Sequence, residues 1–179
     1  MQPSGRIRRG VSWTVGAGAV AAAALFAGQA GALADQPAGT SICASSQLEA
    51  TAVSTEAGAG HRYGQVKLRN TSDNSCTLNG YVGLQLRDSN GRPLPTRVEH
   101  KQGTTPRPVE LEPFETVAAE LEWGVVPTGD EQGGQCQSAP ASVDVGIPGH
   151  SRPQTVGSKW DLGPVCDQGT ITVSPLAVS

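Results

Sequence analysis

The segment Lys67–Leu86 decides the fold, and it reads KLRNTSDNSCTLNGYVGLQL. It opens within a run of alternating apolar and polar side chains, which is typical of a strand with one buried face. Turn-forming residues fill positions 70–75, and Cys76 follows directly. The Gly80-Tyr81 pair then leads into a second strand, in which every second residue is Val or Leu. The segment therefore predicts a β-domain that is held by a disulfide bond.

Similar patterns predict further strands along the chain, over residues 47–55, 63–70, 81–87, 109–111, 115–123, 142–147 and 170–174. Asn90-Gly91 favours a tight hairpin turn, and its return arm, Arg92–Arg97, belongs at a sheet edge because it contains two prolines. Ala and Glu are compatible with a helix over Glu115–Trp123, but the two-residue period there favours a strand. Eight or nine short strands without a credible helix predict an all-β fold, an antiparallel immunoglobulin-like β-sandwich.

The core of such a domain must be poor in aromatic side chains, because the whole chain contains only two Phe, two Tyr and three Trp. Val, Leu, Ile and Ala therefore have to fill most of it. Trp123 and Trp160 are expected to act as its large anchors.

The first 34 residues have the layout of a signal peptide. Three arginines form a basic end, residues 11–26 are apolar, and Ala34 completes a small-residue cleavage site before Asp35. This layout predicts a secreted, extracellular protein. An uncleaved leader that anchors the protein in the membrane is the alternative, and a twin-arginine route is the alternative to general secretion.

Cleavage after Ala34 leaves a flexible lead-in over residues 35–46 and one β-domain over residues 47–179. Three of the 13 Lys and Arg leave with the leader, while all 16 Asp and Glu stay, so the mature chain carries a net charge of −6. Phosphate backbones and anionic lipid surfaces repel an acidic domain of this kind. We therefore expect no nucleic-acid partner, no membrane contact after cleavage, and a monomer.

Four cysteines lie in the mature part, and an even number in an exported chain indicates two disulfides. Three connectivities are possible. Pairing Cys43 with Cys76 and Cys136 with Cys166 is favoured because each bond then closes a loop of about thirty residues, which stabilises the fold by roughly 3–4 kcal/mol. A zinc site is disfavoured, since none of the four forms a Cys-x-x-Cys pair.

Residues that could perform chemistry are present, but none stands in a diagnostic pattern. No Gly-x-Ser-x-Gly elbow occurs, and His61, His100 and His150 are each expected to be solvated loop residues. The segment Asp88–Gly91 superficially resembles a calcium loop, yet it lacks the distal Glu and is expected to be a hairpin turn. We predict no catalytic residue, no metal ligand and no cofactor. The remaining candidates are acidic side chains expected on solvated faces: Glu110, Glu112, Glu115, Glu120 and Glu122.

Four features together resemble one known family. The first is Cys-Ala followed by Gln-Leu, within residues 43–48, and the second is a strand that runs into Leu-Arg-Asn-Thr-Ser and then Cys-Thr-Leu-Asn-Gly-Tyr, within residues 68–81. The third is a Leu-Glu-Pro corner before a strand that ends with Trp, residues 111–123. The fourth is a pair of late cysteines before a last strand, within residues 136–176. The family is the domain-of-unknown-function 4232 family of exported actinobacterial proteins and lipoproteins. The resemblance implies an exported β-sandwich and no assigned activity. Val82 and Phe114 depart from it, because the family usually has Pro and Gly there.

The function expected from these observations is a non-catalytic module that binds or associates structurally at the cell envelope. Its partner would be an extracellular protein or a cell-wall component, met by the loops Glu99–Pro108 and Pro127–Pro140. A secreted protease inhibitor is the first alternative, since a disulfide at Cys136 would brace an exposed loop. An unrecognised hydrolase is the second alternative.

Overall fold

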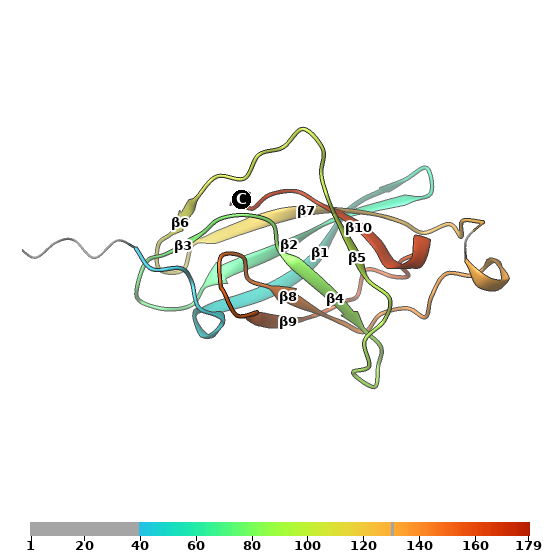
Figure 1. Ribbon diagram of the computed structural model, residues 1–179, viewed down its shortest axis with the longest axis horizontal. Helices are drawn as coiled ribbons and strands as arrows, with labels where there is room; N and C mark the ends of the chain where they lie inside the picture. Colours follow the sequence, from blue (N-terminus) through green and yellow to red (C-terminus); the bar gives the residue numbers. More distant parts are fainter. Residues whose placement is uncertain (1–39, 130) are drawn as a thin grey trace, which may run out of the picture. The chain divides into compact units, whose positions relative to one another are not determined.

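The computed structural model describes residues 40–129 and 131–179. Within these residues the protein is all-β, with eleven strands in three sheets and three short 3-10 turns (Figure 1). No helix in this part of the chain has the length and apolar character needed to cross a bilayer. The predicted signal peptide and its cleavage site between Ala34 and Asp35 lie outside the described residues.

The largest sheet has six strands, and its main order is β1, β2, β7, β10 and β5. A sixth strand, β11, pairs with β7 where β10 has ended. The bounds are β1 (Leu48–Gly58), β2 (His61–Asn70), β7 (Thr116–Gly124), β10 (Thr170–Val173), β5 (Arg97–His100) and β11 (Ala177–Val178). All neighbours are antiparallel except β10 and β5, which are parallel. The predicted all-antiparallel arrangement is therefore wrong at this edge, where the chain crosses from another sheet to join β10 (Figure 1).

Two smaller sheets complete the fold. One pairs β3 (Cys76–Leu78) with β6 (Val109–Leu111), and the other has the order β4 (Gly83–Arg87), β8 (Ser142–Gly146) and β9 (Thr155–Lys159). The predicted strands all exist, but β3, β9 and β11 were not predicted, so the expected eight or nine strands become eleven. β5 begins inside the return arm and takes the first residues of the predicted loop Glu99–Pro108.

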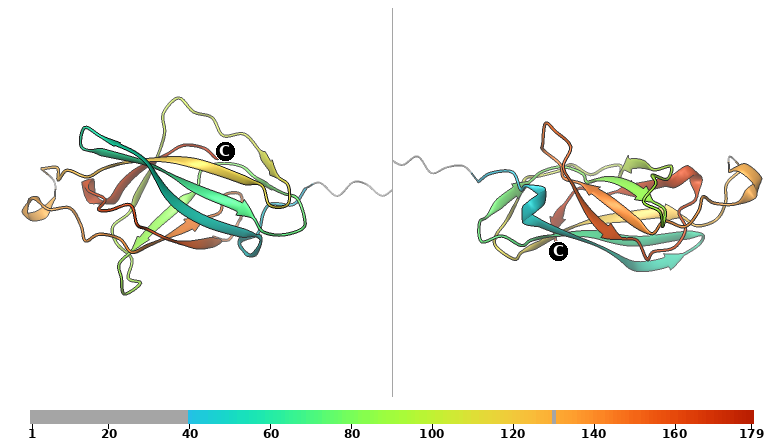
Figure 2. Two further views of the ribbon diagram at one scale, coloured as in Figure 1. Left: turned by 180° about the vertical axis from the view of Figure 1, so that it is seen from behind. Right: turned by 90° about the horizontal axis from the view of Figure 1, so that it is seen from below.

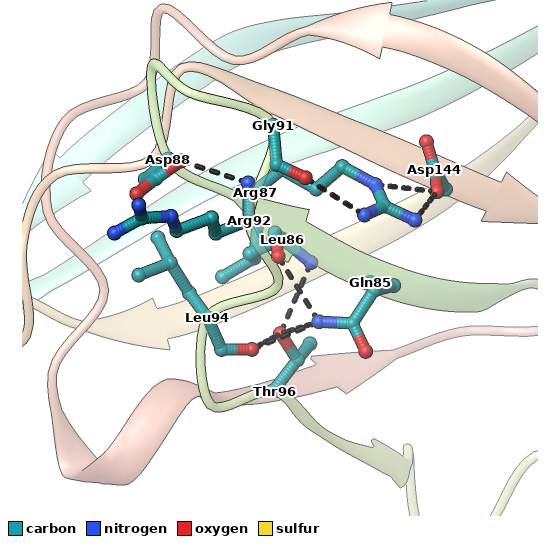
Figure 3. Close-up of polar contacts among 9 residues, drawn as sticks. All are labelled: Gln85, Leu86, Arg87, Asp88, Gly91, Arg92, Leu94, Thr96 and Asp144. Carbon is teal, nitrogen blue, oxygen red and sulfur yellow. Dashed lines mark hydrogen bonds and ion pairs between the residues drawn. The ribbon is translucent and has the colours of Figure 1, made fainter.

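The hairpin after β4 forms as predicted, although its return arm makes few strand-type hydrogen bonds. Pro93 forms one isolated bridge with Arg87, and the N–H of Leu94 donates to the carbonyl of Leu86 at 2.9 Å. Beyond it, the Thr96 hydroxyl accepts the N–H of Leu86 at 3.0 Å, and the Gln85 side chain donates to the Leu94 carbonyl (Figure 3). At this proline-containing sheet edge, side chains therefore supply one acceptor, the Thr96 hydroxyl, and one donor, the Gln85 amide, in place of backbone groups.

One hydrophobic core takes side chains from all three sheets, and its largest members are Trp123 and Trp160. Their ring centroids lie 5.3 Å apart with planes tilted by 56°. Each indole N–H finds a backbone carbonyl, that of Pro164 for Trp123 and that of Gly163 for Trp160. The two predicted anchors are confirmed. The core is otherwise mainly aliphatic, as expected: the alternating residues of β2, β4, β7, β8 and β10 supply Val66, Leu68, Leu84, Leu86, Val117, Leu121, Val143, Val145, Ile171 and Val173.

Both predicted disulfides form, Cys43–Cys76 and Cys136–Cys166. The first joins the chain before β1 to the start of β3, where Cys43 donates its N–H to the Thr77 carbonyl and Thr77 donates to Ser41. These hydrogen bonds of Ser41 and Cys43 lie inside the predicted flexible lead-in. The bonds span 33 and 30 residues, so each is expected to stabilise the fold by roughly 3–4 kcal/mol through the entropy of the unfolded chain.

Asn70, at the end of β2, is the one fully buried polar side chain among the described residues. Its amide nitrogen lies 2.8 Å from the carbonyl oxygen of Asn74 and 3.2 Å from those of Leu111 and Glu112. Its amide oxygen accepts the backbone N–H and the hydroxyl of Ser72. One side chain therefore joins the end of β2, the turn before β3 and the corner after β6. Burial also removes Asn70 as a glycosylation acceptor, despite the Asn-Thr-Ser sequence.

Phe114, in the corner between β6 and β7, adopts a left-handed backbone conformation with φ of 67°. Its N–H donates to the Asn70 carbonyl at 2.9 Å, which fixes the corner against β2. The side chain is 54% exposed, and the Arg69 guanidinium lies 5.4 Å from the ring centroid. A bulky residue is strained at positive φ, so glycine, which the resemblance leads us to expect at this position, would adopt the conformation more easily.

Replacing Asn70 tests the junction. Asn70→Ala should lower the free energy of unfolding by about 3 kcal/mol, because three carbonyls and the Ser72 N–H lose a buried partner. Asn70→Asp should cost at least as much at pH 7, since a carboxylate cannot donate to those carbonyls. Urea unfolding measures both, with the exposed Asn79→Ala as control. A change below about 0.5 kcal/mol in Asn70→Ala would show that the junction does not depend on this side chain.

The strain at Phe114 can be isolated with two substitutions. Phe114→Ala removes the ring but keeps the Cβ atom, whereas Phe114→Gly removes both. We expect Phe114→Gly to be the more stable of the two by about 1 kcal/mol in urea unfolding, because only glycine adopts this conformation freely. Equal stability of the two variants would refute backbone strain at the corner.

Candidate functional site

A cavity of about 310 Å³ opens on the solvent face of the main sheet. β1 contributes Thr55 and Glu56, β2 contributes Tyr63 to Gln65, β7 contributes residues 120–122, and Thr172, Ser174 and Lys101 complete its lining. Strand pairing places four of these residues side by side across the sheet. Tyr63 is the register partner of both Glu56 and Glu122, and Glu122 in turn pairs with Thr172. A partly exposed tyrosine thus lies between two carboxylates. β2 and β7 are packed in the core on their other face, whereas the end of β1 that carries Glu56 is exposed.

The carboxylates of this cavity differ in their pairing. Lys101 donates to Glu120 at 2.9 Å, and this hydrogen bond, with the attraction of the charge, raises the pKa of Lys101. His61 lies 3.5 Å from Glu122, with both side chains about half exposed. Among the described residues, Glu56 has no basic side chain within salt-bridge distance. The cavity therefore combines an aromatic ring, hydroxyls, an amide and more negative than positive charge.

The acidic residues singled out in the sequence do not form one group. Glu120 is exposed and Glu122 partly exposed on the solvent face of β7, as the alternation predicts. Glu110 accepts a hydrogen bond from Thr40, and Glu115 accepts one from the N–H of Glu112. Glu115 precedes Thr116, which lies four residues before Glu120 along β7, a rise of roughly 13 Å. Only the pair on β7 reaches the cavity.

The three histidines differ from the solvated loop residues expected. His61 opens β2 beside Glu122. His100 ends β5 and stacks on Tyr81, with ring centroids 3.8 Å apart and planes 5° from parallel. His150 does lie in a loop, but its Nε2 is 2.8 Å from the Cys43 carbonyl and its Nδ1 is 3.1 Å from the Gln154 amide nitrogen. The carbonyl can only accept, so Nε2 carries the proton, and His150 ties this loop to the first disulfide.

Ser174 is the serine of the cavity, and its hydroxyl is engaged by the backbone. It accepts the N–H of Glu120 at 2.8 Å and donates to the Pro175 carbonyl at 3.1 Å. A nucleophilic serine donates its proton to a general base instead. The hydroxyl holds the end of β10 against β7, which is a structural role.

The Asp88–Gly91 segment is a hairpin turn, as predicted. One carboxylate oxygen of Asp88 accepts the N–H groups of Asn90 and Arg92, both at 2.8 Å. The hydrogen bond from Arg92 is the main cause that lowers the pKa of Asp88. Beside the turn, Arg87 pairs with Asp144 of β8 through two nitrogens, at 2.7 and 2.6 Å, and this pairing raises the pKa of Arg87 (Figure 3).

The predicted loop Pro127–Pro140 extends past the ends of the sheets and contains the short turn η2 (Gln132–Gly134) (Figures 1 and 2). Cys136 fixes it to Cys166, which precedes the turn η3 (Asp167–Gly169). One oxygen of Glu131 and the two sulfurs lie within 4.8 Å of one another. Both sulfurs belong to the disulfide, so this group offers no thiolate to a metal ion.

Sequence patterns locate the strands of the cavity but not its composition. The alternation on β7 predicts that Glu120 and Glu122 face solvent, and it does so correctly. Tyr63 becomes part of the same surface only through the register between β1, β2 and β7, which no local pattern encodes.

Comparison with known families gives one match. A family model described as "Domain of unknown function (DUF4232)" matches residues 43–177, almost the whole described part of the chain. No curated protein and no solved structure matches the chain.

The turn at Asp88 gives a pH prediction. Because the folded state lowers the pKa of this carboxyl, its stabilising effect is present above the unfolded value near 3.8 and is lost as pH falls through the folded value. Asp88→Asn should therefore melt below the wild type at pH 7, and the difference should shrink as the pH falls below about 4. Melting temperatures between about pH 2 and 7 measure it, with the exposed Asp73→Asn as control. A difference independent of pH would contradict the assignment.

Proposed function

We propose that this chain, which belongs to the DUF4232 family of domains of unknown function, is an exported, non-catalytic binding module of the cell envelope. Two disulfides are typical of proteins that fold in an oxidising compartment, and the leader over residues 1–34 supplies the route of export. In this proposal the main sheet and the β4-β8-β9 sheet form an immunoglobulin-like sandwich around their common core, and the protein is a monomer.

The observation that supports a binding function is the cavity on the main sheet, in which Tyr63 lies between Glu56 and Glu122. An exposed tyrosine supplies contact area at a small cost in conformational entropy, and the flanking carboxylates and hydroxyls orient a polar ligand. β2 and β7 are packed in the core on their other face, so Tyr63 and Glu122 extend from strands that are fixed before a ligand arrives, while Glu56 extends from the exposed end of β1. The partner is an extracellular protein or a cell-wall component rather than a nucleic acid or a membrane surface.

Cosedimentation with isolated cell envelopes tests this function. The mature protein should sediment with envelopes of the organism that makes it, and Tyr63→Ala/Glu122→Gln should lower the bound fraction at least tenfold. The matched control is Val178→Ala/Glu49→Gln, which makes the same kinds of change at exposed positions outside the cavity. Equal binding by both double variants would exclude the cavity, and no binding by the wild type would exclude an envelope target.

Export is tested by the intact mass of protein recovered from culture medium. We expect a chain that starts at Asp35 and whose four thiols react with an alkylating reagent only after reduction. A chain that keeps residues 1–34 in a membrane fraction would support the anchored alternative.

A secreted protease inhibitor is a second candidate, favoured by the loop that extends beside Cys136 (Figure 1). A disulfide next to an exposed loop lowers the entropy that the loop loses on docking into a protease. Inhibition of extracellular proteases by the wild type, lost after substitutions within 127–135 but retained in Tyr63→Ala/Glu122→Gln, would support this function over the first.

A further inference from the structure

A second cavity, separate from the one on the main sheet, lies beside the Cys136–Cys166 disulfide and has a volume of about 610 Å³. This volume is in the range of pockets that hold small molecules, roughly 300–1,000 Å³. Pro95 and Cys136 supply its apolar wall. The other lining side chains carry an amide, hydroxyl or carboxylate group: Glu131, Gln135, Gln137, Ser138 and Gln168.

Three polar atoms at this cavity are buried, and among the residues that the structure describes none of them has a hydrogen-bond partner. They are the Oε1 atom of Glu131 and both amide atoms of Gln137. The other carboxylate oxygen of Glu131 accepts the N–H of Thr128 at 2.9 Å, which fixes the orientation of the group. Buried polar atoms are nearly always paired in folded proteins, so three of them at one cavity require an explanation.

The backbone of this cavity is held in an unusual conformation. Asp167 and Gln168 have φ of 53° and 52°, and Gly169 follows with φ of 80°, so three consecutive residues are left-handed. The N–H of Gly169 donates to the Cys166 carbonyl, and the Thr170 hydroxyl donates to the Asp167 carbonyl at 2.7 Å. Two non-glycine residues in this conformation are costly, and strain of this kind concentrates where a ligand is held. Gln168 is itself part of the lining.

We infer that this cavity binds a neutral, polyhydroxylated ligand, one or two sugar residues, through Gln137 and Glu131. The three unpaired atoms define what the ligand must offer. The Oε1 atoms of Glu131 and Gln137 need hydrogen-bond donors, and the Nε2 atom of Gln137 needs an acceptor. Adjacent sugar hydroxyls both donate and accept, so one diol satisfies an amide and a carboxylate together. The carboxylate of Glu131 disfavours phosphate and carboxylate ligands at the same place.

The alternatives predict different results for one substitution. If the unpaired atoms await a ligand, Gln137→Leu removes buried groups that the free protein leaves unpaired, so its melting temperature should equal or exceed that of the wild type. If ordered water satisfies them, the same substitution discards good hydrogen bonds and lowers the melting temperature. Melting of the free, disulfide-bonded protein separates the two cases without any ligand.

Binding is tested with mature protein, residues 35–179, on an array of immobilised neutral oligosaccharides, followed by an NMR titration with the best-bound soluble saccharide. We expect amide shifts confined to residues 131–138 and 166–169, and at least tenfold weaker binding in Gln137→Leu. Gln65→Leu, a matched change in the cavity on the main sheet, should leave affinity unchanged.

Several results would overturn the inference: no saccharide bound, shifts only around Tyr63, triglycine binding at residues 131–138 in place of sugars, or a less stable Gln137→Leu variant. Loss of envelope binding in Tyr63→Ala/Glu122→Gln with saccharide binding retained would show that the two cavities act independently. The saccharide site can therefore fail without the proposed function, and the reverse also holds.

Discussion

The buried side chain of Asn70 is the interaction on which this end of the fold depends. Three chain segments come together there without a common sheet: the end of β2, the turn before β3, and the corner after β6. Their carbonyls and N–H groups point inward, where backbone groups must be satisfied. An amide can donate and accept at once, so one asparagine closes the junction. The polar stretch after Leu68 thus has one fully buried member, Asn70, among exposed and half-buried residues, and Cys76 follows it where the disulfide fixes the same junction to the chain before β1.

The two disulfides serve the fold in different ways. Cys43–Cys76 reinforces a junction that already has Asn70, the Thr77 backbone bonds and the His150 side chain. Cys136–Cys166 instead joins a loop to a left-handed turn, where three buried polar atoms have no hydrogen-bond partner among the described residues. Around Cys43–Cys76 the buried polar groups are hydrogen-bonded, as is usual in folded proteins. Around Cys136–Cys166, among the described residues, three of them are not. The second disulfide therefore joins the two segments in which the described backbone angles and polar groups depart from what is usual in folded proteins.

Sequence reasoning succeeded where one residue type repeats with a period of two. It located β2, β4, β7, β8 and β10, and it paired the cysteines. It missed β9, Thr155–Lys159, because Val156 is its only aliphatic side chain larger than alanine, and it missed β3 because three residues follow directly on a turn. The parallel pairing of β5 with β10 joins segments about seventy residues apart and leaves no local signal. Both cavities depend on such pairing and on loop conformation. The sequence indicated the loop Pro127–Pro140 as a binding surface, but neither cavity.

Phe114 shows that a left-handed backbone conformation has to be interpreted together with the contacts around it. Its left-handed backbone is as unusual as that of Gln168, yet its N–H bonds to Asn70 and its ring lies against Arg69 in a corner whose polar groups are paired. There the strain is the local cost of a corner that glycine would form freely. At Gln168 the strain coincides with a cavity and with buried atoms that have no partner in the part of the chain that the structure describes. Backbone strain alone therefore does not mark a site at Phe114, and its coincidence with unpaired polar atoms distinguishes the cavity beside Cys136–Cys166 from that corner.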